Sequence, residues 1–151
     1  MAKNILRTAI ALTVAMLTVP SQAAPPNSPT DFAAALYRSY ITTIIAVIPK
    51  PAVETAWEAK WLTPHFRTAL PALDEATGVD QIIQAQDTCP SWSTDIKTKL
   101  IASDATSASV AITLGAHTSG WHSLIANLKK QNGQWRLDGV SSEGKGKGGC
   151  S

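Results

Sequence analysis

His122 is the side chain best suited to acid–base chemistry in this 151-residue sequence. It lies in a run where apolar and polar residues alternate, on the apolar side of that run. A titratable group in an apolar enclosure can have the shifted pKa that general acid or base catalysis needs. A catalytic partner could come from Asp87, Tyr37 or Tyr40. The alternative is a structural histidine at a strand end, hydrogen-bonded or hydrated near the rim.

The spacing of the remaining reactive residues argues against metal and nucleophile chemistry. Three histidines and two cysteines show neither an i, i+4 pair on one helix nor a Cys-x-x-Cys motif, so we predict no metal site and no cofactor. No Gly-x-Ser-x-Gly motif and no glycine-rich phosphate loop occurs in the sequence. We therefore assign no catalytic residue, and the sequence is more consistent with a binding protein than with an enzyme.

The first 23 residues have the pattern of a secretory signal peptide. Lys3 and Arg7 form a basic start, residues 5–19 are otherwise apolar, and Ser21 and Ala23 are the small residues of a cleavage site. No cysteine lies near that site, so no lipid anchor is expected at the new N-terminus. We predict a mature protein that begins at about Ala24, is periplasmic or secreted, and has no membrane anchor after cleavage.

The mature chain is electrically balanced. Removing Lys3 and Arg7 from the 13 basic residues leaves 11, against 11 acidic residues. A nucleic-acid-binding protein normally carries a basic excess, so nucleic acid is not an expected partner. The length favours a single α+β domain over residues 24–143, followed by a Gly- and Lys-rich tail over residues 144–151.

Cys89 and Cys150 are the two cysteines of the chain. In an oxidising compartment an even pair predicts a disulfide, which here would close a loop of 61 positions and stabilise the fold by roughly 4 kcal/mol. The alternative is two free thiols, with Cys150 in a disordered end.

Three helices are expected in the first half. Ser28 and Thr63 are N-cap residues, each followed by proline at the first helical position, and Pro51 opens a short helix between them. Gly78 should end the third helix, which Pro71 should kink or divide. The first helix is expected to end before Pro49, with an apolar stripe at every fourth residue: Phe32, Leu36, Tyr40, Ile44 and Ile48.

After Asp80 the hydrophobic period changes to that of strands, and about four antiparallel strands are expected. Asn132 and Gly133 predict a two-residue hairpin turn. That turn would pair Lys130 with Trp135, Leu128 with Leu137, and Ala126 with Gly139. One face would then hold the apolar set His122, Leu124, Ala126, Leu128, Trp135 and Leu137, which should meet the helices. Ile96, Thr98, Leu100 and Ala102 should alternate in the same way on an earlier strand.

The order of helices and strands over about residues 28–140 resembles the nuclear-transport-factor-2-like cone fold. Shorter segments resemble an uncharacterised bacterial domain family of that fold group, found in periplasmic proteins and lipoproteins. These segments are residues 32–40, 61–64, 80–87 and the Asn-Gly-Gln-Trp-Arg-Leu stretch at 132–137. The resemblance implies a helix-covered curved sheet, and it carries no established catalytic residues to this chain.

Two kinds of binding site are expected. The cone could hold a small apolar ligand or, less readily, acid–base chemistry, with Tyr37, Tyr40, His122, Leu124 and Trp135 as lining residues. The main hypothesis is a protein partner in the cell envelope or a secreted toxin, contacted by a set of polar and aromatic candidates: Gln86, Asp87, Trp92, Trp121 and Arg136. Gln86 and Asp87 could instead satisfy backbone groups, and Trp121 could instead pack under the C-terminal tail.

Overall fold

The computed structural model describes residues 28–45 and 49–145. The helical elements are α1 (Pro29–Ser39), a π-helical turn η1 (Tyr40–Ile45), α2 (Pro51–Trp61), α3 (Pro64–Thr77) and a short 3₁₀ turn η2 (Pro90–Ser93). The strands are β1 (Ile96–Ser103), β2 (Ser107–Leu114), β3 (His122–Gln131) and β4 (Gln134–Lys145). The signal peptide, Cys150 and residues 146–151 lie outside the described residues, so the predictions made for them stay predictions.

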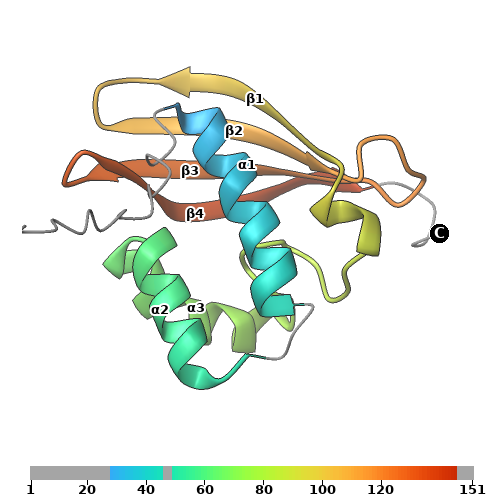
Figure 1. Ribbon diagram of the computed structural model, residues 1–151, viewed down its shortest axis with the longest axis horizontal. Helices are drawn as coiled ribbons and strands as arrows, with labels where there is room; N and C mark the ends of the chain where they lie inside the picture. Colours follow the sequence, from blue (N-terminus) through green and yellow to red (C-terminus); the bar gives the residue numbers. More distant parts are fainter. Residues whose placement is uncertain (1–27, 46–48, 146–151) are drawn as a thin grey trace, which may run out of the picture.

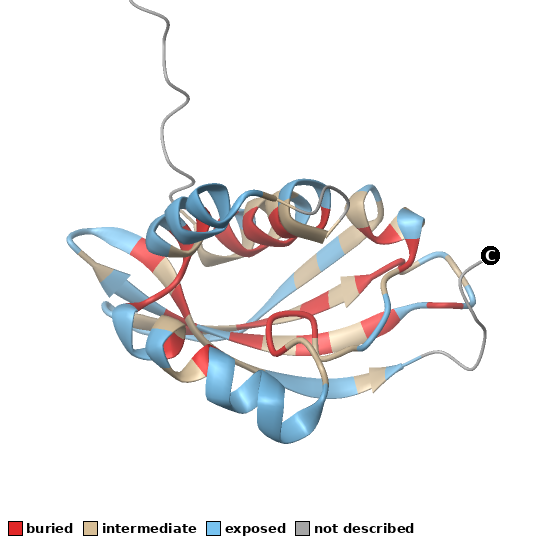
Figure 2. Ribbon diagram, turned by 90° about the horizontal axis from the view of Figure 1, so that it is seen from below, coloured by how far each residue is buried: buried red, intermediate tan, exposed pale blue. Residues whose placement is uncertain are grey.

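The four strands form one open antiparallel sheet in the order β1-β2-β3-β4, which confirms the α+β class (Figure 1). Helix α1 crosses the sheet and contacts β1 and β2, whereas α2 and α3 contact β4. The buried positions gather where helices and sheet face one another (Figure 2). The cone shape predicted from the sequence stays a resemblance.

The predicted helix ends at Ser28, Thr63 and Gly78 are confirmed because they depend on local chemistry. Ser28 Oγ accepts the amide of Asp31 at 3.1 Å, and Thr63 Oγ1 accepts the amide of Phe66 at 3.2 Å. Gly78 ends α3 with a left-handed φ of 67°. Pro71 does not divide α3, because the helix continues through it.

The predicted first helix differs from expectation in its last part. Regular α-helix ends at Ser39, and residues 40–45 form a π-helical turn instead. The Tyr40 amide at this junction bonds the carbonyls of both Leu36 and Tyr37. Phe32, Leu36 and Tyr40 are buried as the stripe predicts.

The β3–β4 hairpin confirms most of the predicted register. Lys130 pairs with Trp135 and Leu128 with Leu137 across the Asn132–Gly133 turn. The third predicted pair is wrong, because Ala126 faces Val140 and not Gly139. The physical reason is a β-bulge that leaves one extra residue, Asp138, on β4.

The bulge also connects the sheet to the helices. Asp138 Oδ1 accepts a hydrogen bond from Thr63 Oγ1 at 2.7 Å, and its Oδ2 lies 2.7 Å from Lys129 Nζ. The Thr63 amide donates to the Leu137 carbonyl at 2.9 Å. The N-cap residue of α3 is therefore fixed to β4 by both its backbone and its side chain.

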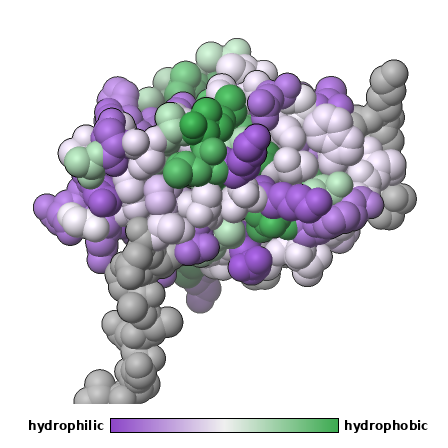
Figure 3. All heavy atoms as spheres, turned by 90° about the horizontal axis from the view of Figure 1, so that it is seen from above, coloured by the Kyte–Doolittle hydropathy of each residue, from purple (hydrophilic) through white to green (hydrophobic). Residues whose placement is uncertain are grey.

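The face predicted to be apolar is buried on β3 and β4, and β2 buries the same side of the sheet. All six members of the β3–β4 set are at most 5% exposed, and β2 alternates buried and half-buried residues along its whole length. The predicted strand forms as β1, but Leu100 and Ala102 are exposed, because a bulge lies between them and this end of the edge strand is uncovered. The view from above shows apolar side chains among polar ones on that side of the molecule (Figure 3).

Among the described helices, none is long and apolar enough to cross a membrane. Strand β4 continues through Gly144 and Lys145, the first two residues of the segment that the sequence assigns to the tail.

Candidate functional site

The five residues expected to line a ligand pocket all lie in the core. Tyr37 and Leu124 are fully buried, and His122, Trp135 and Tyr40 are between 4% and 7% exposed. They do not line one pocket, because Trp135 pairs with Lys130, eight residues along β3 from His122, which corresponds to a separation of roughly 25 Å. Within the described residues, the Tyr37 hydroxyl and Trp135 Nε1 are buried without a hydrogen-bond partner.

Tyr40 has a structural partner in Asp80. The tyrosine hydroxyl donates to Asp80 Oδ2, while Asp80 Oδ1 accepts the amides of Ile82 at 2.8 Å and Ile83 at 3.2 Å. Burial and the neighbouring Asp80 raise the pKa of Tyr40, so the hydroxyl stays protonated. Tyr40 therefore acts here as a donor that ties η1 to the turn at residues 80–85.

His122 is enclosed between an indole ring and a carbonyl group. Its ring stacks on Trp92 with centroids 5.4 Å apart, and its Nε2 lies 2.8 Å from the Ile83 carbonyl oxygen. Because a carbonyl oxygen only accepts, Nε2 carries the proton. Burial lowers the pKa of His122, which favours the neutral ring. This arrangement agrees with the alternative of a hydrogen-bonded histidine at a strand end; Asp87, a suggested catalytic partner, is exposed.

A separate hollow that the sequence analysis missed lies among η1, α2 and α3. It has a volume of about 190 Å³ and is bordered by Tyr40 and Trp57 together with four carboxylates: Glu54, Glu58, Asp74 and Asp80. Burial raises the pKa values of Glu58 and Asp74. In the sequence these residues are spread over three segments, so no local pattern indicates that they meet.

The protein-binding candidates do not form one surface. Gln86 and Asp87 are exposed, and Gln86 Nε2 donates to the Gly78 carbonyl at 3.3 Å. Trp92 is only 5% exposed and contributes to the core. Trp121, in contrast, is 37% exposed.

Trp121 and Arg136 lie at opposite ends of the sheet. Arg136 pairs with Lys129, eight residues after Trp121 along β3, which corresponds to a separation of roughly 25 Å. The structure therefore does not bring Trp121 close to Arg136 and Lys129. The outer part of the Trp121 ring lies against Gly144 at the end of β4 instead.

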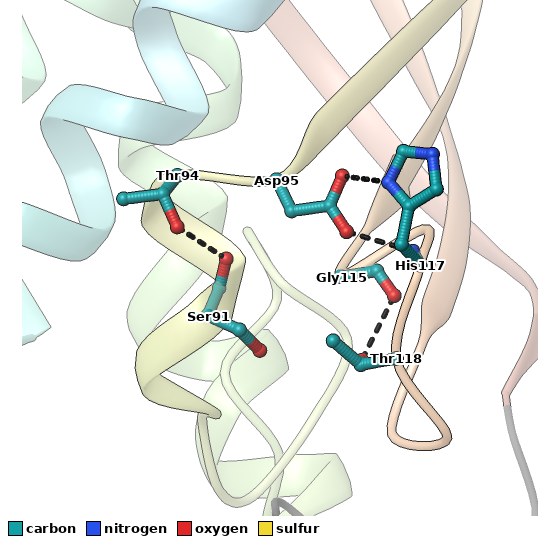
Figure 4. Close-up of polar contacts among 6 residues, drawn as sticks. All are labelled: Ser91, Thr94, Asp95, Gly115, His117 and Thr118. Carbon is teal, nitrogen blue, oxygen red and sulfur yellow. Dashed lines mark hydrogen bonds and ion pairs between the residues drawn. The ribbon is translucent and has the colours of Figure 1, made fainter.

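The loop that precedes Trp121 carries an unexpected histidine–aspartate pair. Asp95 Oδ1 lies 2.9 Å from His117 Nδ1, and Asp95 Oδ2 accepts the His117 amide at 2.7 Å (Figure 4). The two residues are 22 positions apart, so neither spacing nor periodicity signals the contact. The hydrogen bonds that the His117 amide and ring donate lower the pKa of the Asp95 carboxyl group and keep it ionised.

This pair lacks the surroundings of a catalytic site. The His117 side chain is 70% exposed, so no apolar enclosure shifts its chemistry. The nearby hydroxyls of Thr94 and Thr118 donate to the carbonyls of Ser91 and Gly115 (Figure 4). Over residues 28–45 and 49–145, no group of three or more His, Cys, Asp or Glu side chains could hold a metal ion.

No family model matches the sequence, and no curated protein matches it. The fold is similar to a chain of the type VI effector–immunity complex Tae3–Tai3 from Ralstonia pickettii. In its selenomethionine form the TM-score is 0.64 at 17% identity, covering 78% of this chain and 98% of that one. In the native form the TM-score is 0.62 at 19% identity, covering 79% and 98%. A protein of unknown function from Bacteroides thetaiotaomicron VPI-5482 has a TM-score of 0.59 at 21% identity, covering 74% and 87%.

Proposed function

We propose that this chain is an immunity-type binding module of the bacterial cell envelope, which binds a secreted toxin and blocks it. One observation carries the proposal: the fold matches 98% of a chain taken from an effector–immunity complex. At 17% identity the likeness is one of fold, and fold alone does not fix function.

Two features of the molecule agree with a binding role. The titratable side chains expected to do chemistry are committed to packing, since His122 bonds the Ile83 carbonyl and Tyr40 bonds Asp80. The predicted signal peptide would deliver the protein to the periplasm, where it would meet a toxin that arrives from a neighbouring cell. We propose the periplasm as its place of action for that reason.

A competition experiment tests the proposal. The gene for this chain is deleted in its own bacterium, and the deletion strain is grown in contact with the parental strain. We expect the deletion strain to be killed and to be rescued by the full chain, but not by a version that lacks residues 2–23. Equal survival of the deletion and parental strains would contradict a toxin-blocking role. Rescue by the version without its leader would contradict the periplasmic location.

A further inference from the structure

The β2–β3 loop (residues 115–121) projects beyond the strand ends (Figure 1). Hydrogen bonds from the preceding segment hold its base. The Gly115 amide donates to the Asp95 carbonyl at 2.7 Å, and Trp92 Nε1 donates to the Gly120 carbonyl at 2.9 Å. Thr118 closes the loop on itself, since its amide and its hydroxyl both reach the Gly115 carbonyl at 2.9 Å. The loop is therefore ordered before any partner arrives.

The exposed residues of this loop are presented in a fixed arrangement. Gly115 and Gly120 are buried, while His117, Ser119 and Trp121 are exposed. Because the ionised carboxylate of Asp95 can only accept, His117 Nδ1 carries the ring proton, and Nε2 is left as an acceptor in the neutral ring. A side chain that is already oriented loses little conformational entropy on binding, which favours affinity.

The composition of the loop suits a buried contact. Residues 115–121 and the preceding residues 88–94 contain no Asp, Glu, Lys or Arg, and the charged side chain that meets the loop, Asp95, is already hydrogen-bonded to His117. Removing the loop residues themselves from water does not carry the large desolvation cost of unpaired charged groups, and the Asp95 carboxylate keeps its two hydrogen bonds from His117. Trp121 adds an indole that is partly exposed and partly supported by Gly144, and tryptophan is among the residues most enriched in binding hot spots.

We propose that the β2–β3 loop is the contact element for the toxin, inserting His117 and Trp121 into an uncharged cleft of that protein. The cleft would supply an apolar wall for the indole and a hydrogen-bond donor for His117 Nε2. This inference rests on the proposed function, because it names the surface through which the same partner is bound.

The competition experiment above, repeated with variants, tests the loop directly. The double variant with His117→Ala and Trp121→Ala should lower survival of the rescued strain by at least about tenfold, as expected for loss of two hot-spot residues. His65→Ala is a matched control on an exposed histidine of α3, and Ile101→Ala is a matched control on an exposed apolar residue of β1. Thermal midpoints and periplasmic levels of all variants are measured, so that a folding defect is not read as lost binding.

A photo-crosslinking residue in place of Ser119 gives a second readout. During attack it should form an adduct with one protein of the attacking strain, and deleting the gene for that protein should abolish killing. The same crosslinking residue at position 65 should form no adduct. If the unmodified chain gives no protection, the proposed function fails and the loop inference with it. If the chain protects but the folded double variant protects equally, or if a control loses protection as strongly, the loop inference alone is overturned.

Discussion

The two ends of the sheet are each organised by an aspartate near the surface, but their hydrogen bonds span very different stretches of chain. Asp104 accepts four hydrogen bonds from Thr106 and Ser107, all within three residues, in the turn between β1 and β2. Asp95 accepts its side-chain bonds from His117, 22 residues away. One turn is complete in itself, whereas the other loop exists only because a second segment fixes it.

The two ends of the sheet also differ in the charge of their surfaces. The end with the Asp104 turn and the Asn132–Gly133 turn is charged, with Lys129, Lys130 and Arg136 nearby on β3 and β4. The other end has Asp95 and Lys145, but its segments 88–94 and 115–121 contain no charged residue. The first end closes the sheet with short turns, and the contact proposed above would use the second.

The largest effect should come from comparing Gly115→Ala with Gly133→Ala. Both glycines have positive φ, 63° and 76°, so alanine is strained at each by about 1 kcal/mol. A Cβ at Gly115 would also lie 2.8 Å from Thr118 Oγ1 and 2.9 Å from Trp92 Cδ1, whereas one at Gly133 meets nothing within 4 Å. We expect Gly115→Ala to lower the free energy of unfolding by about 3 kcal/mol, against about 1 kcal/mol for Gly133→Ala.

Urea denaturation of the mature protein measures both values. Equal losses for the two variants would show that the β2–β3 loop adapts to a methyl group. The loop would then lack the fixed shape that the contact proposal requires.

The same contrast explains which parts of the fold the sequence predicts. Ser28, Thr63, Gly78 and the Asn132–Gly133 turn act within a few residues of themselves, and each was found where the pattern indicates. The Leu128–Leu137 pair follows from the turn, and prediction failed beyond it because the Asp138 bulge depends on a bond to Thr63, 75 residues away.

The candidate sites were less predictable for the same physical reason. Burial of His122 could be read from alternation, but its stacking on Trp92 and its bond to Ile83 join segments that no pattern connects. The Asp95–His117 pair likewise depends on how η2 lies against the loop. The exposure of Trp121 was left open by the sequence, and the structure shows the side chain 37% exposed, with its ring beside Gly144 at the end of β4.

A second comparison uses two buried tryptophans at opposite ends of the sheet. Trp92 Nε1 donates to the Gly120 carbonyl at 2.9 Å, whereas Trp135 Nε1 is buried without a partner among the described residues. Both substitutions by phenylalanine remove similar ring area. Trp92→Phe also leaves a buried carbonyl unpaired, so it should cost about 1 to 2 kcal/mol more than Trp135→Phe.

Hydrogen exchange locates this second effect as well as measuring it. In Trp92→Phe the amides of residues 115–121 should exchange faster than in the unsubstituted protein, and in Trp135→Phe they should not change. Unchanged exchange in both variants would mean that the Trp92 bond does not hold the loop.

The smallest expected effect separates the two aspartates by pH. Hydrogen bonds hold the pKa of Asp104 and that of Asp95 below the usual value. A carboxyl group whose pKa is lower in the folded protein than in the unfolded chain stabilises the fold while it is ionised. That stabilisation is complete above about pH 4 and is lost as the pH falls toward the folded pKa. Asp104→Asn should therefore flatten the decline of the thermal midpoint below pH 4 more than Asp95→Asn, because four donors face Asp104 and two face Asp95.

At pH 7 the order of importance for recognition should be reversed. Asp95→Asn weakens the acceptor that orients His117, so it should reduce protection in the competition experiment, whereas Asp104→Asn should leave protection unchanged. The ¹⁵N shifts of the His117 ring report the cause, since loss of the carboxylate should reduce the population with the proton on Nδ1. If both substitutions leave protection intact, orientation of His117 by Asp95 has no part in binding, and the two ends of the sheet differ in how they fold but not in what they recognise.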